Sequence, residues 1–359
     1  MPNNILGSHS PPYAAYKPGT PEWIAVWKQY PEFQTEMLTY QKLLQSGINP
    51  IENTGTTDDV FRVSNSALEA SATCSTLALL RYGYQVIPIE DVFPIQVGTA
   101  IHAALAVLYR TGDKQAAFIA LLNTYPKGLP PKANYEWDNV SCIMTHYIDA
   151  VVLPYFISPD LVELWFEQVL HEDEEGTIVL CGRIDALPQD NTTQSLWVMD
   201  NKSTGKITDW WLKKFRMGSQ LTGYTWAASR FLGQHIPGAI INGIELPKLP
   251  MPGKKCRVHG VDYAECRKYH ANHQVFQLER PPHALETWKL DAVYQAKRLR
   301  ELVKTYAVSP EGIKYVRMQG TMCGGCTFCS FIDFCIANRP VEWIGSVLQY
   351  KPELVKVEG

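Results

Sequence analysis

The order of apolar and polar residues predicts helices in the first third of the chain. Three helices are predicted there, over residues 20–47, 62–85 and 98–112. The first has Thr20 as N-cap and Pro21 in its opening turn, and the second has Ser64 or Ser66 as N-cap. Gly98 opens the third helix, which carries one histidine, His102, beside its apolar positions.

From residue 161 onward the pattern changes to short runs typical of strands. Strands are predicted over residues 161–170, 177–187, 195–203, 238–249 and 273–281. Long amphipathic helices are predicted over 208–233, where Gly233 ends the helix, and over about 284–307. Two strands, a helix and another strand in succession indicate an α/β fold with a mixed β-sheet flanked by helices. Residues 248–272 look like an insertion.

Composition sets limits on function. Of 359 residues, 46% are hydrophobic and 19% are charged, so the chain can bury an ample core. The formal net charge of −3 means that any nucleic acid must be bound by a local basic groove rather than by the whole surface. The first residues lack the pattern of a secretory signal, and no apolar run suggests a membrane span. We therefore expect a soluble, intracellular protein of the cytoplasm that has no membrane partner.

The stretch from residue 182 to residue 205 places acids and a base at the ends of two predicted strands. Asp185 ends one strand, and Asp200 and Lys202 end the other. Side chains alternate along a strand, so Asp200 and Lys202 point to one side and Asn201 to the other. Two neighbouring carboxylates, with the backbone carbonyl of Asn201, would bind Mg²⁺ or Mn²⁺. The alternative is a surface ion pair and a turn residue.

The lone histidine of the third helix is open to two interpretations. A histidine beside an apolar face is by default a core residue whose hydrogen bonds are satisfied. His102 could instead supply a further ligand to the metal site.

Four short motifs resemble a known family. GTAIH, GRIDAL, VMDNKST and QLTGY occur in the order and approximate spacing of the RecB-like branch of the PD-(D/E)XK nuclease superfamily. The resemblance implies a restriction-endonuclease-like fold and a metal-dependent deoxyribonuclease. It implies that His102, Asp185 and Asp200 are metal ligands, that Lys202 is the catalytic lysine, and that Gln220 and Tyr224 face the substrate. Unlike many relatives, the chain has no acid four residues after His102.

Four cysteines extend the resemblance. Cys326, Cys329 and Cys335 are spaced C-x2-C-x5-C, and Cys74 stands far upstream. This arrangement resembles the iron–sulfur clasp of AddB-type and CRISPR-associated members of the same branch. Four thiolates suit a [4Fe-4S] cluster or a structural zinc ion, and the resemblance favours the cluster.

Other cysteines and histidines are given weaker interpretations. Cys323 is then not needed as a ligand, and Cys142 and Cys181 are interpreted as core residues. A second set of possible ligands lies around the insertion, but its spacing fits no common zinc pattern. Its members are Cys256, His259, Cys266, His270 and His273.

The resemblance also implies an organisation and a substrate. We predict a flexible lead and helical preface at 1–60, a nuclease domain at 61–340 and a tail at 341–359. Lys206, Lys213 and Lys214 follow the catalytic strand and are candidate phosphate contacts. Four aromatic residues interleave with these lysines or follow them, and they could stack unpaired bases, although at least two must be core. They are Trp210, Trp211, Tyr224 and Trp226.

The expected function is that of an exonuclease on single-stranded DNA ends, in recombination, repair, phage replication or CRISPR adaptation. No nucleotide-binding motif of a helicase is present, so unwinding would need a helicase or recombination partner. Two other classes compete with this interpretation. One is an inactive DNA-binding or helicase-partner subunit on the same fold. The other is an iron–sulfur or zinc scaffold whose acids are structural.

Overall fold

The computed structural model describes most of the chain from Val60 onward. The described residues are 60–126, 135–150, 153–216, 218–246, 262, 272–307, 310–316, 326, 329–339 and 348–350. The chain divides into one unit that contains Met1–Gly55 and another that contains Thr56–Val357. The helix predicted at 20–47, most of the insertion, Cys323 and four of the five possible zinc ligands around that insertion lie outside the described residues.

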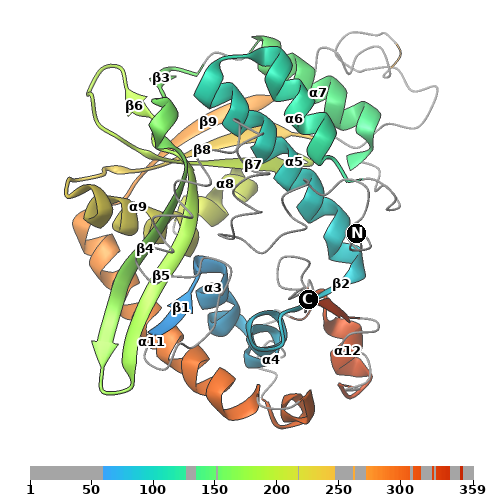
Figure 1. The fold of residues 1–359 in the computed structure, drawn as a ribbon, viewed down its shortest axis with the longest axis vertical. Helices are drawn as coiled ribbons and strands as arrows, with labels where there is room; N and C mark the ends of the chain where they lie inside the picture. Colours follow the sequence, from blue (N-terminus) through green and yellow to red (C-terminus); the bar gives the residue numbers. More distant parts are fainter. Residues whose placement is uncertain are drawn as a thin grey trace, which may run out of the picture. The chain divides into compact units, whose positions relative to one another are not determined.

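A six-stranded mixed sheet forms the centre of the second unit (Figure 1). Its strands are β1 (Val60–Val63), β4 (Val162–Asp173), β5 (Gly176–Ala186), β7 (Val198–Thr204), β8 (Gly238–Glu245) and β9 (His273–Glu279). The strand order is β1-β5-β7-β8-β9, and β4 pairs with β5. β7 and β8 are parallel, whereas β4–β5 and β8–β9 are antiparallel. The predicted α/β fold with a mixed sheet is therefore confirmed.

Helices cover both faces of the sheet, because the strands at its centre are apolar on both sides. α5 (Ile89–Thr111), α6 (Lys114–Thr124) and α7 (Trp137–Ala150) share a buried core with Ile244 of β8. α3 (Asn65–Thr73), α9 (Ser219–Leu232) and α11 (Pro282–Tyr306) share another core with Val198 of β7 and Ile241 of β8. Figure 1 shows these two groups of helices on opposite sides of β7 and β8.

The helix predicted over residues 62–85 is wrong as one element. Its first two residues belong to β1, and Ser64 caps α3 by accepting a hydrogen bond from Ala67 N at 3.2 Å. The backbone then leaves the helical region at Cys74, whose φ of −163° and ψ of 128° are extended. α4 (Ser75–Ala78) and a π-helical turn (Leu79–Gly83) follow. The cysteine therefore lies at a break between two helices.

The helix predicted over residues 208–233 is also two elements. α8 (Asp209–Arg216) ends before Gly218, whose extended backbone precedes α9. Gly233 ends α9 with a φ of 64°, as predicted, because a left-handed residue at this position favours glycine. α5 begins nine residues before the predicted start and contains Pro94. α6 and α7 are not predicted from the sequence.

A glycine sets how closely the helices on the α9 side approach one another. A Cβ on Gly223 of α9 would lie 2.3 Å from Asn65 Oδ1 of α3 and 2.6 Å from Trp288 Cζ2 of α11. Any side chain here would require the side chains of Asn65 and Trp288 to shift. The contact fixes α9, which carries two of the predicted site residues.

The remaining elements are short. β2 (Val86–Pro88) pairs with β10 (Leu348–Tyr350), and β3 (Tyr155–Phe156) pairs with β6 (Gln189–Asp190). α12 (Ile332–Ile336) and the 3-10 turns Pro159–Leu161 and Pro310–Tyr315 complete the described structure. Within the described part of the chain, none of the helices combines the length and apolar character that a membrane crossing requires.

Candidate active site

The two strands that carry the predicted acids meet at one pair of residues. β5 and β7 are register partners at Ala186 and Met199, immediately beside Asp185 on one strand and Asp200 on the other. Both acids are buried, with 8% of Asp185 and 2% of Asp200 exposed. The sheet therefore brings both predicted carboxylates to one place.

Asp200 and Lys202 lie on the α9 side of β7. Lys202 Nζ is 2.8 Å from Asp200 Oδ2, and it donates to Asp200 Oδ1 and to Gln220 Oε1, each at 3.2 Å. Gln220 Nε2 in turn donates to Tyr224 Oη at 3.3 Å, because residues four apart share one face of α9. The four predicted residues form one continuous chain of contacts.

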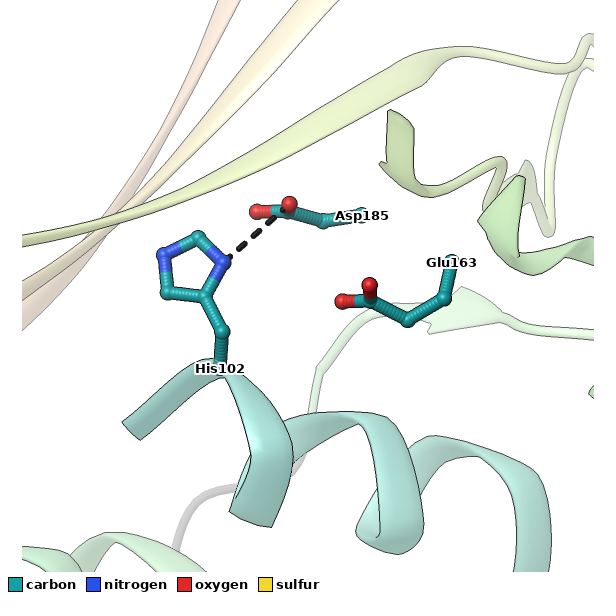
Figure 2. A group of neighbouring side chains, drawn as sticks. All are labelled: His102, Glu163 and Asp185. Atoms are coloured by element: carbon teal, nitrogen blue, oxygen red, sulfur yellow. Dashed lines mark hydrogen bonds and ion pairs between the residues drawn. The ribbon is translucent and has the colours of Figure 1, made fainter. Parts of the chain in front are cut away.

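Asp185 is held by its two oxygens in different ways. Oδ1 lies 3.2 Å from His102 Nδ1 of α5 (Figure 2). Oδ2 accepts the backbone N–H of Asn201 at 2.7 Å and its side-chain Nδ2 at 3.1 Å. His102 is thus a partner of the carboxylate rather than an isolated core residue. The structure places the N–H and the side chain of Asn201, and the role of its carbonyl stays a prediction.

The site contains a third carboxylate, which was not predicted from the sequence. Figure 2 shows Glu163 of β4 pointing toward Asp185 and His102. One potential ligand atom from each of these three residues lies within 4.8 Å of the others. Arg183 Nε holds Glu163 Oε2 at 2.8 Å. The φ of Glu163 is 55°, a costly conformation for a residue other than glycine and one that clusters at functional sites.

An irregularity in β4 hides Glu163 from sequence reasoning. The hairpin begins with Asp173 opposite Gly176, and this register would place Leu164 opposite Asp185. A shift between Val169 and His171 moves the register by one residue, so Val162 pairs with Ala186. Glu163 thereby comes opposite Asp185. A one-residue shift in register moves the side chains of a strand to the opposite face of the sheet. The residues of β4 contain no sequence signal for such a shift.

The two aspartates are electrostatically different. Burial raises the pKa of Asp185, but the charge and hydrogen bond of His102, the Asn201 N–H and Lys202 outweigh it and hold that pKa below its usual value. Burial and the charge of Asp185 raise the pKa of Asp200 in spite of Lys202. Burial lowers the pKa of Lys202, but the charges of Asp200 and Asp185 raise it by more, so that this pKa lies above its usual value. Lys202 is therefore a stable cation.

The donor set fits a hard divalent cation. Oxygens of Asp185 and Glu163 with one imidazole nitrogen of His102, which all lie within 4.8 Å of one another, match the ligands that Mg²⁺ and Mn²⁺ accept, whereas Asp200 is not part of this group. Asp200 Oδ2 is buried and accepts no well-oriented hydrogen bond, although the Lys202 ammonium is close. An oxygen of this kind can donate a lone pair to a cation. Asp185, with one oxygen facing His102, can do the same.

Without a cation, a proton on His102 supplies positive charge to the site. Burial lowers the pKa of His102, but the Asp185 carboxylate and more distant acids raise it to about 9. A histidine must be neutral to bind a metal ion. We therefore expect Mn²⁺ binding to release a proton from His102 at pH 7.5, and Mn²⁺ affinity to rise with pH up to about 9.

Titration calorimetry in two buffers with different ionisation enthalpies measures this proton release. His102→Gln should lose the part of the buffer-dependent heat that His102 contributes. Equal heats in both buffers for the wild-type protein would contradict the assignment. The metal-free wild type should also lose stability as the pH rises from 6.5 to about 9, because His102 is protonated more strongly in the folded chain.

The predicted phosphate contacts and stacking residues differ in their exposure to solvent. Lys206, Lys213 and Lys214 are all exposed. Burial and the charge of Lys202 lower the pKa of Lys214, which places this lysine in the field of the site. Among the aromatic residues, Trp211 and Trp226 are core, Tyr224 is half-buried at the site, and Trp210 is 79% exposed.

The four cysteines assigned to the clasp lie near one another. Burial, together with the neighbouring thiols of Cys329, Cys74 and Cys326, raises the pKa of Cys335 to about 11. Cys329 and Cys335 also pack against a buried cluster that contains Leu79, just after Cys74, and Phe334 of α12. Segments more than two hundred residues apart thus place three thiols within electrostatic range of Cys335. Among the described residues, the cysteines do not form a group of three sulfurs as close as the ligand atoms of His102, Glu163 and Asp185. Cys181 is buried in the core, as predicted, and Cys142 is half-buried.

A mixed sheet with two buried aspartates, a paired lysine and a glutamine on the covering helix defines a class of protein, the metal-dependent nucleases. The family model of the PD-(D/E)XK nuclease superfamily matches residues 62–336, and the chain belongs to this superfamily. Nucleases of the superfamily use divalent metal ions and act on DNA. No curated protein matches the chain.

Proposed function

We propose that the protein is a Mg²⁺- or Mn²⁺-dependent deoxyribonuclease of the RecB-like branch, and that it acts as an exonuclease on single-stranded DNA ends. The observation that carries the proposal is the contact chain from Asp200 through Lys202 to Gln220. A surface ion pair would be exposed and would not reach a second polar residue on the covering helix. Here the acid is buried and the lysine is aimed by two partners.

Each residue has a distinct role in this proposal. Asp185, Asp200 and His102, with the Asn201 carbonyl, hold the cation, and Glu163 adds a carboxylate in place of the missing helix acid. When bound, the cation lowers the pKa of a water molecule and neutralises charge on the phosphate. Lys202 keeps its proton and stabilises the extra negative charge of the transition state. Gln220 and Tyr224 bind the substrate backbone beside it.

The test is incubation of the purified protein with end-labelled single- and double-stranded DNA, with Mn²⁺ or with a chelator. We expect Mn²⁺-dependent release of short products from single-stranded ends. Binding without cleavage would favour the inactive helicase-partner subunit, and neither binding nor cleavage would favour the scaffold. Equal cutting of a closed circle and a linear strand would show an endonuclease. A helicase or recombination protein would supply frayed ends from a duplex.

Preference for single strands gains support from α8. Trp210 is largely exposed on this helix, one turn before Lys214, and the last turn of α8 is basic. Lysines bind phosphates, whereas an exposed indole stacks on unpaired bases. In a Lys202→Ala background that prevents cleavage, Trp210→Ala should weaken single-strand binding about tenfold, since stacking contributes ~1–3 kcal/mol per base. Fluorescence anisotropy of a labelled oligonucleotide measures the loss.

Two controls make this result specific. Tyr294→Ala removes another exposed aromatic residue, 65% exposed on α11, and should leave binding unchanged. An abasic oligonucleotide keeps its phosphates but offers nothing to stack on. It should bind equally to the protein with and without Trp210, and a tenfold difference on this ligand would contradict stacking.

The cysteine clasp is the second part of the proposal. Cys74, Cys326, Cys329 and Cys335 supply four sulfur donors, which suit a [4Fe-4S] cluster or a structural zinc ion. We favour the cluster. Its role would be to tie the break between α3 and α4 to the segment around α12, and so to stabilise the domain without taking part in cleavage.

Protein purified without oxygen should therefore be brown and absorb broadly near ~400 nm, as thiolate-bound iron does. Alanine at any of the four cysteines should remove the colour, because each supplies a ligand. Cys323→Ala is the matched control and should keep the colour. A colourless protein with one zinc ion would overturn the cluster, and colour lost with Cys323 would show a different ligand set.

A further inference from the structure

Four polar side chains, three of them buried and one half-buried, lie behind Asp185 on the face of the sheet covered by α5 and α7. Asn201 of β7 and Asn242 of β8 are register partners, and they are 3% and 0% exposed. Tyr109 of α5 and Tyr147 of α7 meet them from the helices. None of the four reaches the α9 side, where Lys202 lies.

These residues interrupt an apolar row. Met199, Ile240 and Ile244 flank the two asparagines on the same face and are essentially fully buried. A buried amide carries a desolvation penalty that an aliphatic side chain of similar size avoids. Moreover, Asn242 Oδ1 has no hydrogen-bond partner among the described residues. Packing therefore does not explain why this apolar row contains two asparagines, and these polar side chains require another reason.

The hydrogen bonds impose one orientation on Asn201. A carboxylate only accepts, so the side-chain nitrogen of Asn201 must face Asp185 Oδ2, to which it donates at 3.1 Å. Its oxygen must then face the opposite way. There it accepts from Tyr109 Oη at 2.9 Å and from Asn242 Nδ2 at 2.7 Å. With these two donors in place, the Asn201 amide cannot rotate without losing three hydrogen bonds.

Asn242 is oriented by the same logic. Its Nδ2 lies 2.7 Å from Asn201 Oδ1, 2.8 Å from Tyr147 Oη and 3.0 Å from Tyr109 Oη. A flipped Asn242 would place two amide oxygens face to face. Donation to the carboxylate therefore has one direction: Asn242 Nδ2 and Tyr109 Oη donate to Asn201 Oδ1, and Asn201 Nδ2 donates to Asp185 Oδ2. Tyr147 Oη accepts from Asn242 Nδ2 and so helps to hold that amide in place.

We propose that Asn242 and Tyr109 are positioning residues of the cation site. They fix the orientation of the Asn201 amide, which donates a hydrogen bond to Asp185 Oδ2. The other oxygen, Asp185 Oδ1, then remains directed toward His102 and the cation. The inference rests on the proposed function only in that Asp185 is a metal ligand. Residues that orient a ligand in this way commonly change metal affinity by about 10- to 100-fold when they are replaced.

The test measures Mn²⁺ affinity by calorimetry without DNA, alongside the melting temperature of the metal-free protein. Asn242→Leu keeps the size of the side chain and continues the apolar row, and Tyr109→Phe removes one hydroxyl. Each should weaken Mn²⁺ binding about 10-fold or more without lowering the cleavage rate at saturating Mn²⁺ to a similar extent. Ile240→Leu, on the same face of β8, is the control and should leave the affinity unchanged.

The outcomes are separable. Unchanged Mn²⁺ affinity in Tyr109→Phe, which disturbs the fold least, would overturn the proposal even if Asn242→Leu does not fold. Variants that lose cleavage at every Mn²⁺ concentration but bind the ion normally would also overturn it. A wild-type protein that binds Mn²⁺ but does not cut DNA would refute the proposed function and leave this test valid. A wild type that binds no Mn²⁺ would refute both.

Discussion

Replacing Lys202 with alanine should lower the rate of DNA cleavage by about 100- to 1000-fold, the usual loss when one group that stabilises the transition state is removed. The ammonium is aimed by Asp200 and Gln220 and keeps its proton because its pKa is raised. Mn²⁺ affinity should not fall, because removing a positive charge cannot weaken the binding of a cation. Single-turnover cleavage and calorimetry measure the two quantities separately.

Lys314→Ala provides the matched control, because this lysine is exposed in the turn Pro310–Tyr315 and is not among the predicted phosphate contacts. It should retain cleavage within a few-fold. The metal-free Lys202→Ala protein should melt lower than wild type, since the buried Asp200 carboxylate loses its charged partner. Saturating Mg²⁺ should restore part of this stability. A Lys202→Ala protein with wild-type activity would contradict the nuclease assignment of this strand.

Replacing either aspartate with asparagine should abolish cleavage, but the two variants should differ in the stability of the metal-free protein. The folded chain favours the charged form of Asp185, whose pKa is lowered, and disfavours that of Asp200, whose pKa is raised. Above a pH of about 4, where both ionise in the unfolded chain, Asp185 therefore stabilises the fold, whereas ionised Asp200 destabilises it.

We expect Asp185→Asn to lower the melting temperature in chelator at pH 7.5 and Asp200→Asn to raise it. Both variants should bind Mn²⁺ weakly, because each lacks a ligand. The stability that Asp185 provides should be lost as the pH falls through its lowered pKa. Shifts of the two melting temperatures in the same direction would show that the aspartates are not electrostatically distinct.

Local sequence patterns predicted most of the fold. They also predicted which side chains of the motifs lie on the same face of one strand or one helix. Strand alternation placed Asp200 and Lys202 together and Asn201 apart, and helical spacing placed Gln220 beside Tyr224. These relations depend on one element at a time. The breaks at Cys74 and Gly218 fall in short runs of weak helix formers, 73–76 and 218–219, but the helical periodicity on either side of each run favours one continuous helix.

The rest of the site depends on contacts between elements that no local pattern contains. Glu163 reaches Asp185 through a register shift seven residues away, and Asn242 reaches Asn201 because two parallel strands separated by α8 and α9 are in register. Tyr109 and Tyr147 look like ordinary aromatic core residues in the sequence. Their hydroxyl groups acquire a role only when both helices dock on the sheet.

The single pair of residues that joins β5 to β7 has a mechanical consequence. On one side lies the long β4–β5 hairpin and on the other the ladder of β7, β8 and β9. Within β5 and β7 the pairing is limited to Ala186 and Met199, and a bridge between Gln189 and Leu196 continues it beyond the strand ends. Asp185 belongs to the first half and Asp200 to the second. Under the proposed function, ligands to one ion would come from both halves. A cation bound there would link the two halves electrostatically, so we expect metal binding to stiffen the protein at the proposed active site.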